Sequence, residues 1–406
     1  MNKYRNILII FWIAFFAVTC KSTIQKNNPA NQWVGTWYTS QQLVEPHNLP
    51  PEPGLSHNTL RQIVRVSIGG ETVRLKLANS FTSEPVEIKE ISIAASISED
   101  KVDVNSLKLL EFEGEKSTII PAYGEVYSDP VAYDLVAGSL LAITIHFGEV
   151  ASDITGHPGS RTTSYLTLYN QAASPDFEDP ITTDHWYMIN GVEVYVPADY
   201  AAIAVLGNSI TDGRGSGTNK QNRWTDILSE RLLKNEETKN IAVLNMGIGG
   251  NCVLRGGLGP TALERFEKDI LLQPNLRWLI ILEGINDIGS AQSEEDAEQV
   301  AIDLIDAYRQ MIKEAHSKGI LVYGATILPF SQSFYDAPFR QSARDKVNEW
   351  IRNSTQFDAV IDFDKMMQDE ENNAQIQADM HDGDFLHPNE GGYRRMGERI
   401  DLNLFR

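Results

Sequence analysis

The chain has 406 residues, of which 42% are hydrophobic and 22% are charged, and 55 acidic against 35 basic residues give a net charge of −20. This is the composition of a globular protein, and at roughly 150 residues per domain the length predicts two or three domains. The negative charge argues against a nucleic-acid-binding surface, because phosphate binding needs clustered lysine and arginine. Two cysteines are too few for a disulfide-rich scaffold.

The start of the chain has the pattern of an export signal. Two basic residues precede an apolar run over 7–18, and about 12 apolar residues suit a secretory signal, whereas a membrane-spanning helix needs about 20. The run ends in Ala-Val-Thr-Cys, which resembles a bacterial lipobox with threonine where a smaller residue is usual. We expect 1–20 to be a lipoprotein signal, Cys20 to carry the lipid, and 21–31 to be a tether. This predicts a cell-envelope protein that touches the membrane only through its lipid; plain secretion and a retained anchor helix are the alternatives.

Residues 32–197 show the alternation that is typical of half-buried β-strands. Apolar residues occupy every second position in 64–68 and again in 73–77, and a Gly-Gly pair lies between these runs. Two alternating runs joined by a tight glycine turn predict a β-hairpin over 60–80. No convincing amphipathic helix interrupts this region, so we predict an all-β sandwich domain.

From residue 198 the pattern changes to short apolar runs separated by helical segments, as expected for parallel strands that are covered on both faces. The runs are Ala201–Leu206, Ile241–Leu244, Trp278–Leu282, Ile320–Ala325 and Ala359–Phe363. The clearest helix begins after Ser293, carries one apolar stripe from Ala297 to Ala315 and ends before Gly319. We predict a flavodoxin-like, doubly wound α/β domain over 198–406 with a five-stranded parallel sheet and a site at the carboxyl ends of its strands.

Four polar segments follow strands of this predicted sheet. Ser209 follows the first run in Gly-Asn-Ser-Ile-Thr, Gly250 lies in a glycine-rich turn after the second, and Asn286 follows the third. His387 comes after the fifth run, three residues beyond Asp384, and a carboxylate at that spacing can hold the imidazole tautomer. Each segment alone is explained as well by a turn or a helix cap, but the four in this order indicate catalysis by a serine nucleophile.

Taken together, these segments resemble the SGNH (GDSL-type) hydrolase superfamily, with Asn208 where aspartate is usual. The segment Trp-Val-Gly-Thr-Trp at 33–37 and the predicted hairpin are similar to a subgroup that carries a β-domain before the catalytic domain. The resemblance therefore implies an SGNH hydrolase fold and ester hydrolysis without a cofactor or a metal.

The resemblance also implies a role for each matching residue. Ser209 attacks the ester carbonyl, His387 takes its proton, and Asp384 orients the imidazole. Asp382 is the alternative partner of His387, since spacing alone does not exclude it. The implied oxyanion-hole donors are the Ser209 and Gly250 backbone N–H groups and the Asn286 side chain.

Other classes of site fit the sequence less well. Gly247 begins a dinucleotide-binding pattern, but Cys252, which we expect to be a buried apolar residue, occupies its third glycine position. No metal-binding motif accompanies the one cluster of candidate ligands, so we expect no metal. That cluster comprises His381, Asp382, Asp384 and His387.

The main alternative to an enzyme is a glycan-binding surface lipoprotein, because aromatic side chains of the β-region could stack on sugars. Their commoner role is core packing. These side chains are Trp33, Trp37, Tyr38 and Trp186.

We expect the substrate to be a poly- or oligosaccharide that carries acetyl or another small acyl group. An exported protein with an accessory β-sandwich is typical of glycan processing, although a lipase or an acylhydrolase of another ester is an alternative. Arg214, Asn251 and Glu283 are neighbours of the predicted triad and candidate substrate contacts, and a structural role explains each of them equally well. His157 and Arg161 lie in a loop that could approach the site, but the sequence does not place them there.

Overall fold

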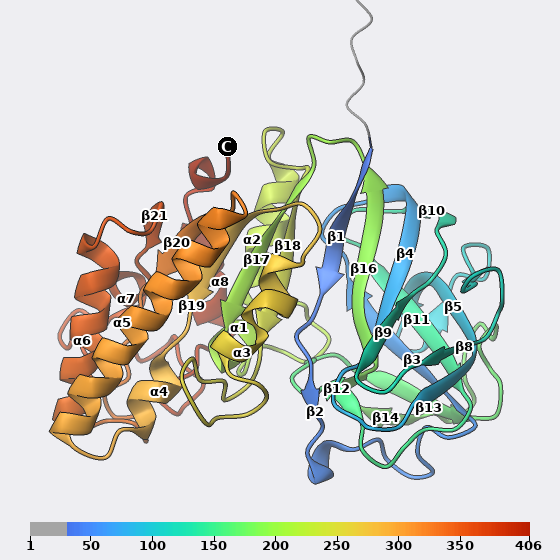
Figure 1. The fold of residues 1–406 in the computed structure, drawn as a ribbon, viewed down its shortest axis with the longest axis horizontal. Coiled ribbons are helices and arrows are strands. Elements are labelled where there is room, and N and C mark those ends of the chain that lie inside the picture. The colour runs from blue at the N-terminus through green and yellow to red at the C-terminus, as the bar shows by residue number, and fades with distance from the viewer. Residues whose placement is uncertain (1–30) are drawn as a thin grey trace, which may run out of the picture.

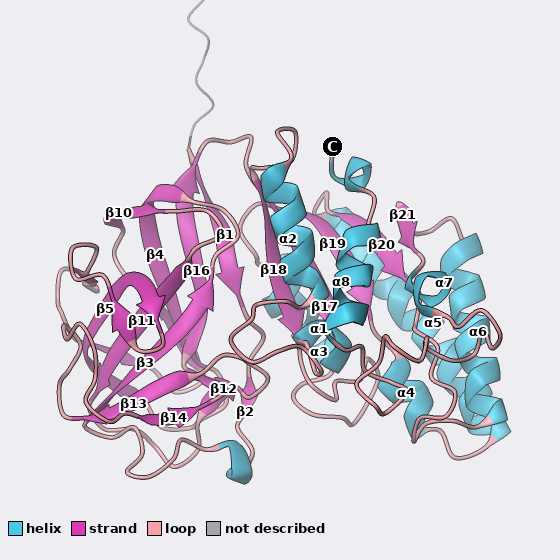
Figure 2. Ribbon diagram, turned by 180° about the vertical axis from the view of Figure 1, so that it is seen from behind, coloured by secondary structure: helices cyan, strands magenta, loops and turns pink. Residues whose placement is uncertain are grey.

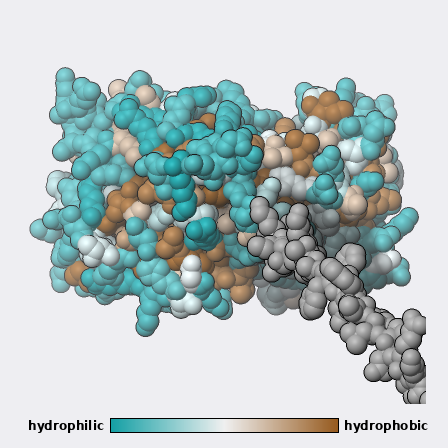
Figure 3. All heavy atoms as spheres, turned by 90° about the horizontal axis from the view of Figure 1, so that it is seen from above, coloured by the Kyte–Doolittle hydropathy of each residue, from teal (hydrophilic) through white to brown (hydrophobic). Residues whose placement is uncertain are grey.

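The computed structural model describes residues 31–406, which form a β-rich N-terminal part and an α/β C-terminal part that lie side by side (Figure 1). The predicted signal, Cys20 and all but the last residue of the predicted tether lie outside the described residues. From residue 31 onward, no helix is long and apolar enough to cross a bilayer. The face seen in Figure 3 is mostly hydrophilic, with hydrophobic residues in separate patches.

The N-terminal part is a sandwich of two antiparallel sheets, which confirms the predicted fold class. One sheet has the order β1-β16-β4-β10, with β9 also on β4, and contains β1 (Gln32–Tyr38), β4 (Gly70–Asn79), β9 (Gly124–Tyr127), β10 (Val131–Leu135) and β16 (Ile189–Val196). The other has the order β14-β13-β3-β11-β5-β6, with β7 and β8 also on β5. It contains β3 (Asn58–Arg65), β5 (Val86–Ser98), β6 (Lys101–Val102), β7 (Lys108–Leu109), β8 (Thr118–Ile120), β11 (Leu140–Phe147), β13 (Ser164–Leu168) and β14 (Ile181–Thr183). A small third sheet joins β2 (Gln42–Leu43), β12 (Thr155–His157) and β15 (Trp186–Tyr187).

The predicted hairpin over 60–80 is wrong, because β3 and β4 lie in different sheets. β3 pairs with β11 and β13, whereas β4 pairs with β16, β10 and β9. The chain crosses between the sheets after β3, where the Ser67 backbone N–H donates to the carbonyl of Thr36 (2.9 Å). Alternation shows which face of a strand is apolar but not which strand lies beside it. Here the apolar faces point into the sandwich, so Val64 and Val73 are both buried.

The C-terminal part has the predicted five-stranded parallel sheet. Its order is β18-β17-β19-β20-β21, with β17 (Ala201–Gly207), β18 (Ile241–Gly247), β19 (Leu276–Leu282), β20 (Leu321–Ala325) and β21 (Ala359–Ile361). In chain order this is 2-1-3-4-5, the flavodoxin-like arrangement. The helices α2 (Trp224–Lys234) and α8 (Glu390–Arg399) cover one face, and α5 (Glu294–Ser317) and α6 (Pro338–Asn353) cover the other (Figure 1, Figure 2). The shorter helices are α1 (Ser209–Asp212), α3 (Ala262–Phe266), α4 (Ile285–Ser290) and α7 (Phe363–Met367), and single turns of 3-10 or π helix occupy Pro46–Asn48, Glu267–Leu271 and Leu402–Phe405.

Helix α5 forms as its sequence predicts. The Ser293 side chain accepts a hydrogen bond from the backbone N–H of Asp296 (3.2 Å), which caps the first turn. The predicted stripe from Ala297 to Ala315 is the buried face, and Gly319, just beyond the end, has a φ of 75°.

The sandwich covers the open edge of the parallel sheet. β18 is an edge strand, and β1 lies along it, with a parallel bridge between Thr39 and Asn245 just beyond β1. Ser67 Oγ lies 3.2 Å from both the N and the O of Val243, so it satisfies backbone groups that an uncovered edge would leave unpaired. One continuous set of buried apolar side chains runs from Val34 in the sandwich to Leu244 in the parallel sheet and beyond.

Candidate active site

Ser209, His387 and Asp384 form one hydrogen-bonded chain at the carboxyl end of the parallel sheet. Ser209 Oγ lies 2.8 Å from His387 Nε2, and His387 Nδ1 lies 2.6 Å from Asp384 Oδ2. Asp384 Oδ1 also accepts from the backbone N–H groups of Leu386 (3.0 Å) and His387 (2.9 Å), so one turn fixes both the carboxylate and the imidazole. With the proton on Nδ1 facing Asp384, Nε2 is free to accept the serine proton.

The electrostatic surroundings favour a neutral imidazole beside a charged carboxylate. Burial lowers the pKa of His387, and the opposing effect of Asp384 does not fully offset it. Burial raises the pKa of Asp384, but hydrogen bonds from the His387 side chain and from two backbone N–H groups outweigh this, so its pKa is lowered overall. At neutral pH the pair is therefore set to accept a proton at Nε2.

Asp382, the alternative partner, is not part of this chain of hydrogen bonds. Its backbone N–H donates to the carbonyl of His387 (2.8 Å). Its carboxylate is on an exposed residue and makes no hydrogen bond or ion pair within residues 31–406. The structure thus places Asp384 against the imidazole.

Three candidate oxyanion donors follow three adjacent strands, β17, β18 and β19. Ser209 begins α1, and Gly250 has a φ of 69°, a left-handed conformation that favours glycine. Among the described residues, neither of these backbone N–H groups has an acceptor. Asn286 Nδ2 donates one hydrogen bond to the carbonyl of Asn251 (2.7 Å), which leaves its second N–H unused.

Residues 205–395 match the sequence model of the GDSL-like Lipase/Acylhydrolase family. This region is a GDSL-like acylhydrolase domain. The predicted family is therefore confirmed, and no curated protein matches the chain.

The GDSL-like domain has several counterparts among solved structures. A catalytic mutant of an acetylxylan esterase from Geobacillus stearothermophilus is 18% identical, with 49% of this chain and 91% of that chain covered and a TM-score of 0.39. A carbohydrate acetylesterase from Sinorhizobium meliloti is 13% identical, with 50% and 98% covered and a TM-score of 0.38. A GDSL-like lipase from Bacteroides thetaiotaomicron is 20% identical, with 48% and 84% covered and a TM-score of 0.33.

Two residues that the sequence analysis missed support the oxyanion donors of the GDSL-like domain. Tyr335 OH donates to Asn286 Oδ1 (3.0 Å) and so fixes which way the amide points. Arg265, buried on α3, donates to the carbonyls of Gly207 (3.1 Å) and Met246 (2.7 Å), which ties together the ends of β17 and β18. Neither residue follows a strand directly, so no motif marked it.

Two of the three predicted substrate contacts are instead internal, which corrects that prediction. Asn251 is fully buried; its Nδ2 donates to the carbonyls of Leu258 (2.9 Å) and Pro260 (2.8 Å), and its Oδ1 accepts from Arg265. Glu283 is also buried, and burial raises its pKa to about 8. A polar side chain at a strand end can point into the protein when buried groups there form hydrogen bonds with it. Only Arg214, the third candidate, is exposed.

The departure from the family pattern at Asn208 has a structural explanation. Asn208 Oδ1 accepts from the backbone N–H of Ile210 (3.1 Å), which caps α1, and its Nδ2 donates to Glu283 Oε2 (3.1 Å). A carboxylate could cap the helix but could not donate to Glu283. The asparagine therefore suits the buried glutamate beside it.

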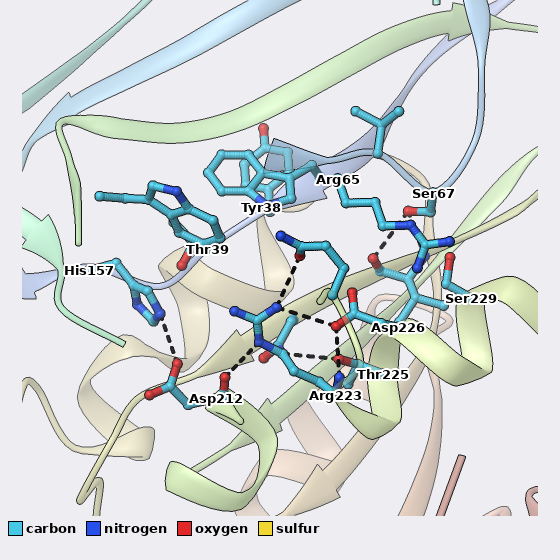
Figure 4. A pocket seen from close by; sticks show the side chains of 16 residues that line it. Tyr38, Thr39, Arg65, Ser67, His157, Asp212, Arg223, Thr225, Asp226 and Ser229 are labelled. Carbon is cyan, nitrogen blue, oxygen red and sulfur yellow. Dashed lines mark hydrogen bonds and ion pairs between the residues drawn. The ribbon is translucent and has the colours of Figure 1, made fainter. Parts of the chain in front are cut away.

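The sandwich contacts the GDSL-like domain through the end of β12 and the loop that follows it. His157 Nε2 lies 2.9 Å from Asp212 Oδ1 (Figure 4), and its Nδ1 lies 2.9 Å from the carbonyl of Ser40. Gly159 packs so tightly that an added Cβ would lie 1.9 Å from Asp212 Oδ2. This segment of the sandwich therefore packs against the last residue of the helix that Ser209 begins, and a cavity of about 50 Å³, lined in part by His157 and Asp212, remains at the junction.

The remaining candidates have structural surroundings. Trp37, Tyr38 and Trp186 are buried in the core, while the partly buried Trp33 packs on the ring of Tyr195, with centroids 5.2 Å apart.

Cys252 is buried, and burial raises the pKa of its thiol to about 12. Within residues 31–406 no group of three or more His, Cys, Asp or Glu side chains is arranged to hold a metal ion.

Proposed function

We propose that the protein is a serine esterase that removes acetyl, or another small acyl group, from a poly- or oligosaccharide. The hydrogen-bonded chain from Ser209 through His387 to Asp384 carries the proposal. It joins a nucleophile, a neutral base and an orienting carboxylate at the carboxyl end of the parallel sheet, in a domain that matches an acylhydrolase family.

In the proposed reaction, Ser209 Oγ attacks the acyl carbonyl while His387 Nε2 takes the hydroxyl proton. The carbonyl oxygen becomes an oxyanion that accepts hydrogen bonds from the Ser209 and Gly250 backbone N–H groups and from Asn286 Nδ2. Each such donor typically contributes about 3 kcal/mol of transition-state stabilisation. His387 then gives its proton to the departing sugar hydroxyl, which leaves Ser209 acylated. Water attacks this acyl-enzyme with the help of His387, releases the carboxylic acid and restores the serine.

An exposed aromatic side chain near the oxyanion donors supports a saccharide as the alcohol part of the ester. The exposed side chain of Phe334 lies next to Tyr335, and the centroids of these two rings are 4.4 Å apart. The Phe334 ring offers an aromatic surface on which a sugar ring can stack. The proposal includes export and a lipid anchor at Cys20, which would hold the enzyme against the glycans of the cell envelope.

The first experiment compares wild type with Ser209→Ala on 4-nitrophenyl esters of increasing acyl length at pH 7.5, with and without chelator. Ser317→Ala, an exposed serine at the end of α5, is the matched control. We expect turnover by Ser209→Ala to fall by orders of magnitude, the control to match wild type, and acetate to be preferred over longer acyl groups. Acetate release from acetylated oligosaccharides then tests the sugar.

Equal rates for wild type and Ser209→Ala would contradict the proposed esterase, and glycan binding without catalysis would then explain the fold better. A preference for long acyl chains would contradict the small acyl group and would indicate a lipase.

A further inference from the structure

Arg214 presents a free positive charge beside the nucleophile. Its backbone N–H donates to the carbonyl of Ser209 (2.9 Å), and its own carbonyl accepts from Tyr393 OH (2.6 Å). The residue is exposed, and no described residue accepts a hydrogen bond from its guanidinium or pairs with it within 4.0 Å. Its backbone is therefore held next to Ser209, while its charge is available to a ligand.

Arg161 brings a second charge to the same place from the sandwich. The backbone N–H of Asn219 donates to its carbonyl (3.0 Å), and its φ of 50° is a left-handed conformation that is unfavourable outside glycine. Its Nη2 lies 3.9 Å from Asp212 Oδ2, too far for a hydrogen bond, and its buried Nε has no acceptor among residues 31–406. A guanidinium has five N–H donors in a fixed plane, so this one is poorly satisfied by the protein itself.

Both charges act on His387. Each guanidinium lowers the pKa of His387, in addition to the larger effect of burial and against the effect of Asp384. Arg214 is bonded through its backbone to Ser209 at the start of α1, and Arg161 lies against Asp212 at the end of α1, so both arginines flank the helix that carries the nucleophile. Three carboxylates lie in the same region: Asp384 is bound to His387, Asp212 is bound to His157, and the exposed Asp382 lies beside Gly215, where an added Cβ would be 3.1 Å from Asp382 Cβ. The two guanidiniums do not outnumber these carboxylates, but among the described residues no carboxylate lies within hydrogen-bond distance of either guanidinium.

We propose that Arg161 and Arg214 together bind a carboxylate of the substrate, so that the preferred substrate is an acylated saccharide that contains uronic acid units. The planar guanidinium matches a carboxylate with two parallel hydrogen bonds, and a sugar carboxylate near the scissile ester would lie between the two side chains. This inference rests on the proposed esterase function and assigns to the sandwich a direct part in choosing the substrate.

The bound carboxylate acts on the rate as well as on affinity. When His387 takes the serine proton it becomes an imidazolium, which the two guanidiniums repel. A carboxylate held between them offsets that repulsion when the imidazolium forms, and so stabilises the transition state more than the ground state. The anionic substrate should therefore have a higher kcat as well as a lower KM than its neutral counterpart.

The test uses a matched pair of substrates: acetylated galacturonate oligomers, and the same oligomers after their carboxylates have been reduced to primary alcohols. Acetate release is measured for wild type, Arg161→Gln and Arg214→Gln. Arg309→Gln is the control, since Arg309 is partly exposed on α5 and the substitution removes the same charge away from the site.

We expect wild type to show a kcat/KM at least about tenfold higher on the carboxylate form, as for a hydrogen-bonded charged contact. Arg161→Gln and Arg214→Gln should each lose about tenfold on that form and less on the reduced form, whereas Arg309→Gln keeps the wild-type preference. The acid limb of the pH–rate profile should also move to higher pH in both site variants, because each arginine lowers the pKa of His387.

Equal kcat/KM of wild type on the two substrates, or a preference retained in both site variants, would overturn the inference. The 4-nitrophenyl acetate assay separates this from failure of the proposed function. Hydrolysis that depends on Ser209 but shows no carboxylate preference overturns only the anion site, whereas hydrolysis that does not depend on Ser209 overturns the esterase itself.

Discussion

The substitution Tyr335→Phe removes one hydroxyl and tests whether the orientation of Asn286 matters for catalysis. Tyr335 OH donates to Asn286 Oδ1 (3.0 Å), and its ring fills the space beside Gly289, where an added Cβ would lie 2.4 Å from it. Phenylalanine keeps the ring, so the change removes one hydrogen bond worth about 0.5–1.5 kcal/mol. We expect kcat to fall roughly 2- to 12-fold with little change in KM, because the oxyanion forms only in the transition state.

The assay is steady-state hydrolysis of 4-nitrophenyl acetate by wild type, Tyr335→Phe, Asn286→Ala and the double variant. Asn286→Ala should cost about 3 kcal/mol, or more than about 100-fold in kcat. Because Tyr335 acts through Asn286, the double variant should be no slower than Asn286→Ala. Tyr169→Phe is the control, since Tyr169 is an exposed tyrosine of the sandwich. A Tyr335→Phe loss that persists in full without Asn286 would refute the positioning role.

Three further predictions follow from buried groups. His157→Ala leaves the buried carboxylate of Asp212 without its hydrogen-bond partner, so the free energy of unfolding in urea should fall by about 3 kcal/mol; an unchanged value would mean that the His157 contact contributes nothing. Burial raises the pKa of Glu283 from 4.5 to about 8, so the folded protein keeps a proton that the unfolded chain releases, and stability is lost as pH rises through this window. Between about pH 5 and pH 8, the free energy of unfolding should fall by a few kcal/mol less for Glu283→Gln than for wild type, as measured by denaturant titration at each pH. The same pH dependence in the two proteins would contradict this. Burial raises the pKa of the Cys252 thiol to about 12, so the native protein should resist iodoacetamide at pH 7.5 and Cys252→Ala should keep its activity; rapid alkylation of the folded protein would show that the thiol is accessible.

The sequence predicted those parts of the site that short contiguous segments carry. Ser209, Gly250 and Asn286 each follow a strand directly, and the carboxyl ends of neighbouring parallel strands share one edge of the sheet. His387 and Asp384 are three residues apart in one turn, so their contact needed no knowledge of the remaining fold.

The rest depended on long-range packing that a linear pattern does not contain. Apolar and polar residues alternate in both β3 and β4, yet these two strands lie in opposite sheets of the sandwich and do not pair with each other. Glu283 was predicted to face the substrate because it ends a strand, but the amide of Asn208 draws its carboxyl group inward. Tyr335 and Arg161 come from segments remote from the motifs, and only the folded chain shows that they reach the site.

The contact between β1 and β18 predicts that the GDSL-like domain is less stable and less soluble when it is produced without the sandwich. A recombinant fragment that starts near residue 198 would expose the backbone of β18 and apolar side chains such as Leu244, and an open strand of this kind is a template for self-association. It would also lack His157 at the end of β12 and Arg161 in the following loop, which lie against Asp212 at the end of α1. The structural unit is therefore larger than the 205–395 segment that matches the family model, and a change in the sandwich loop alters the surroundings of α1.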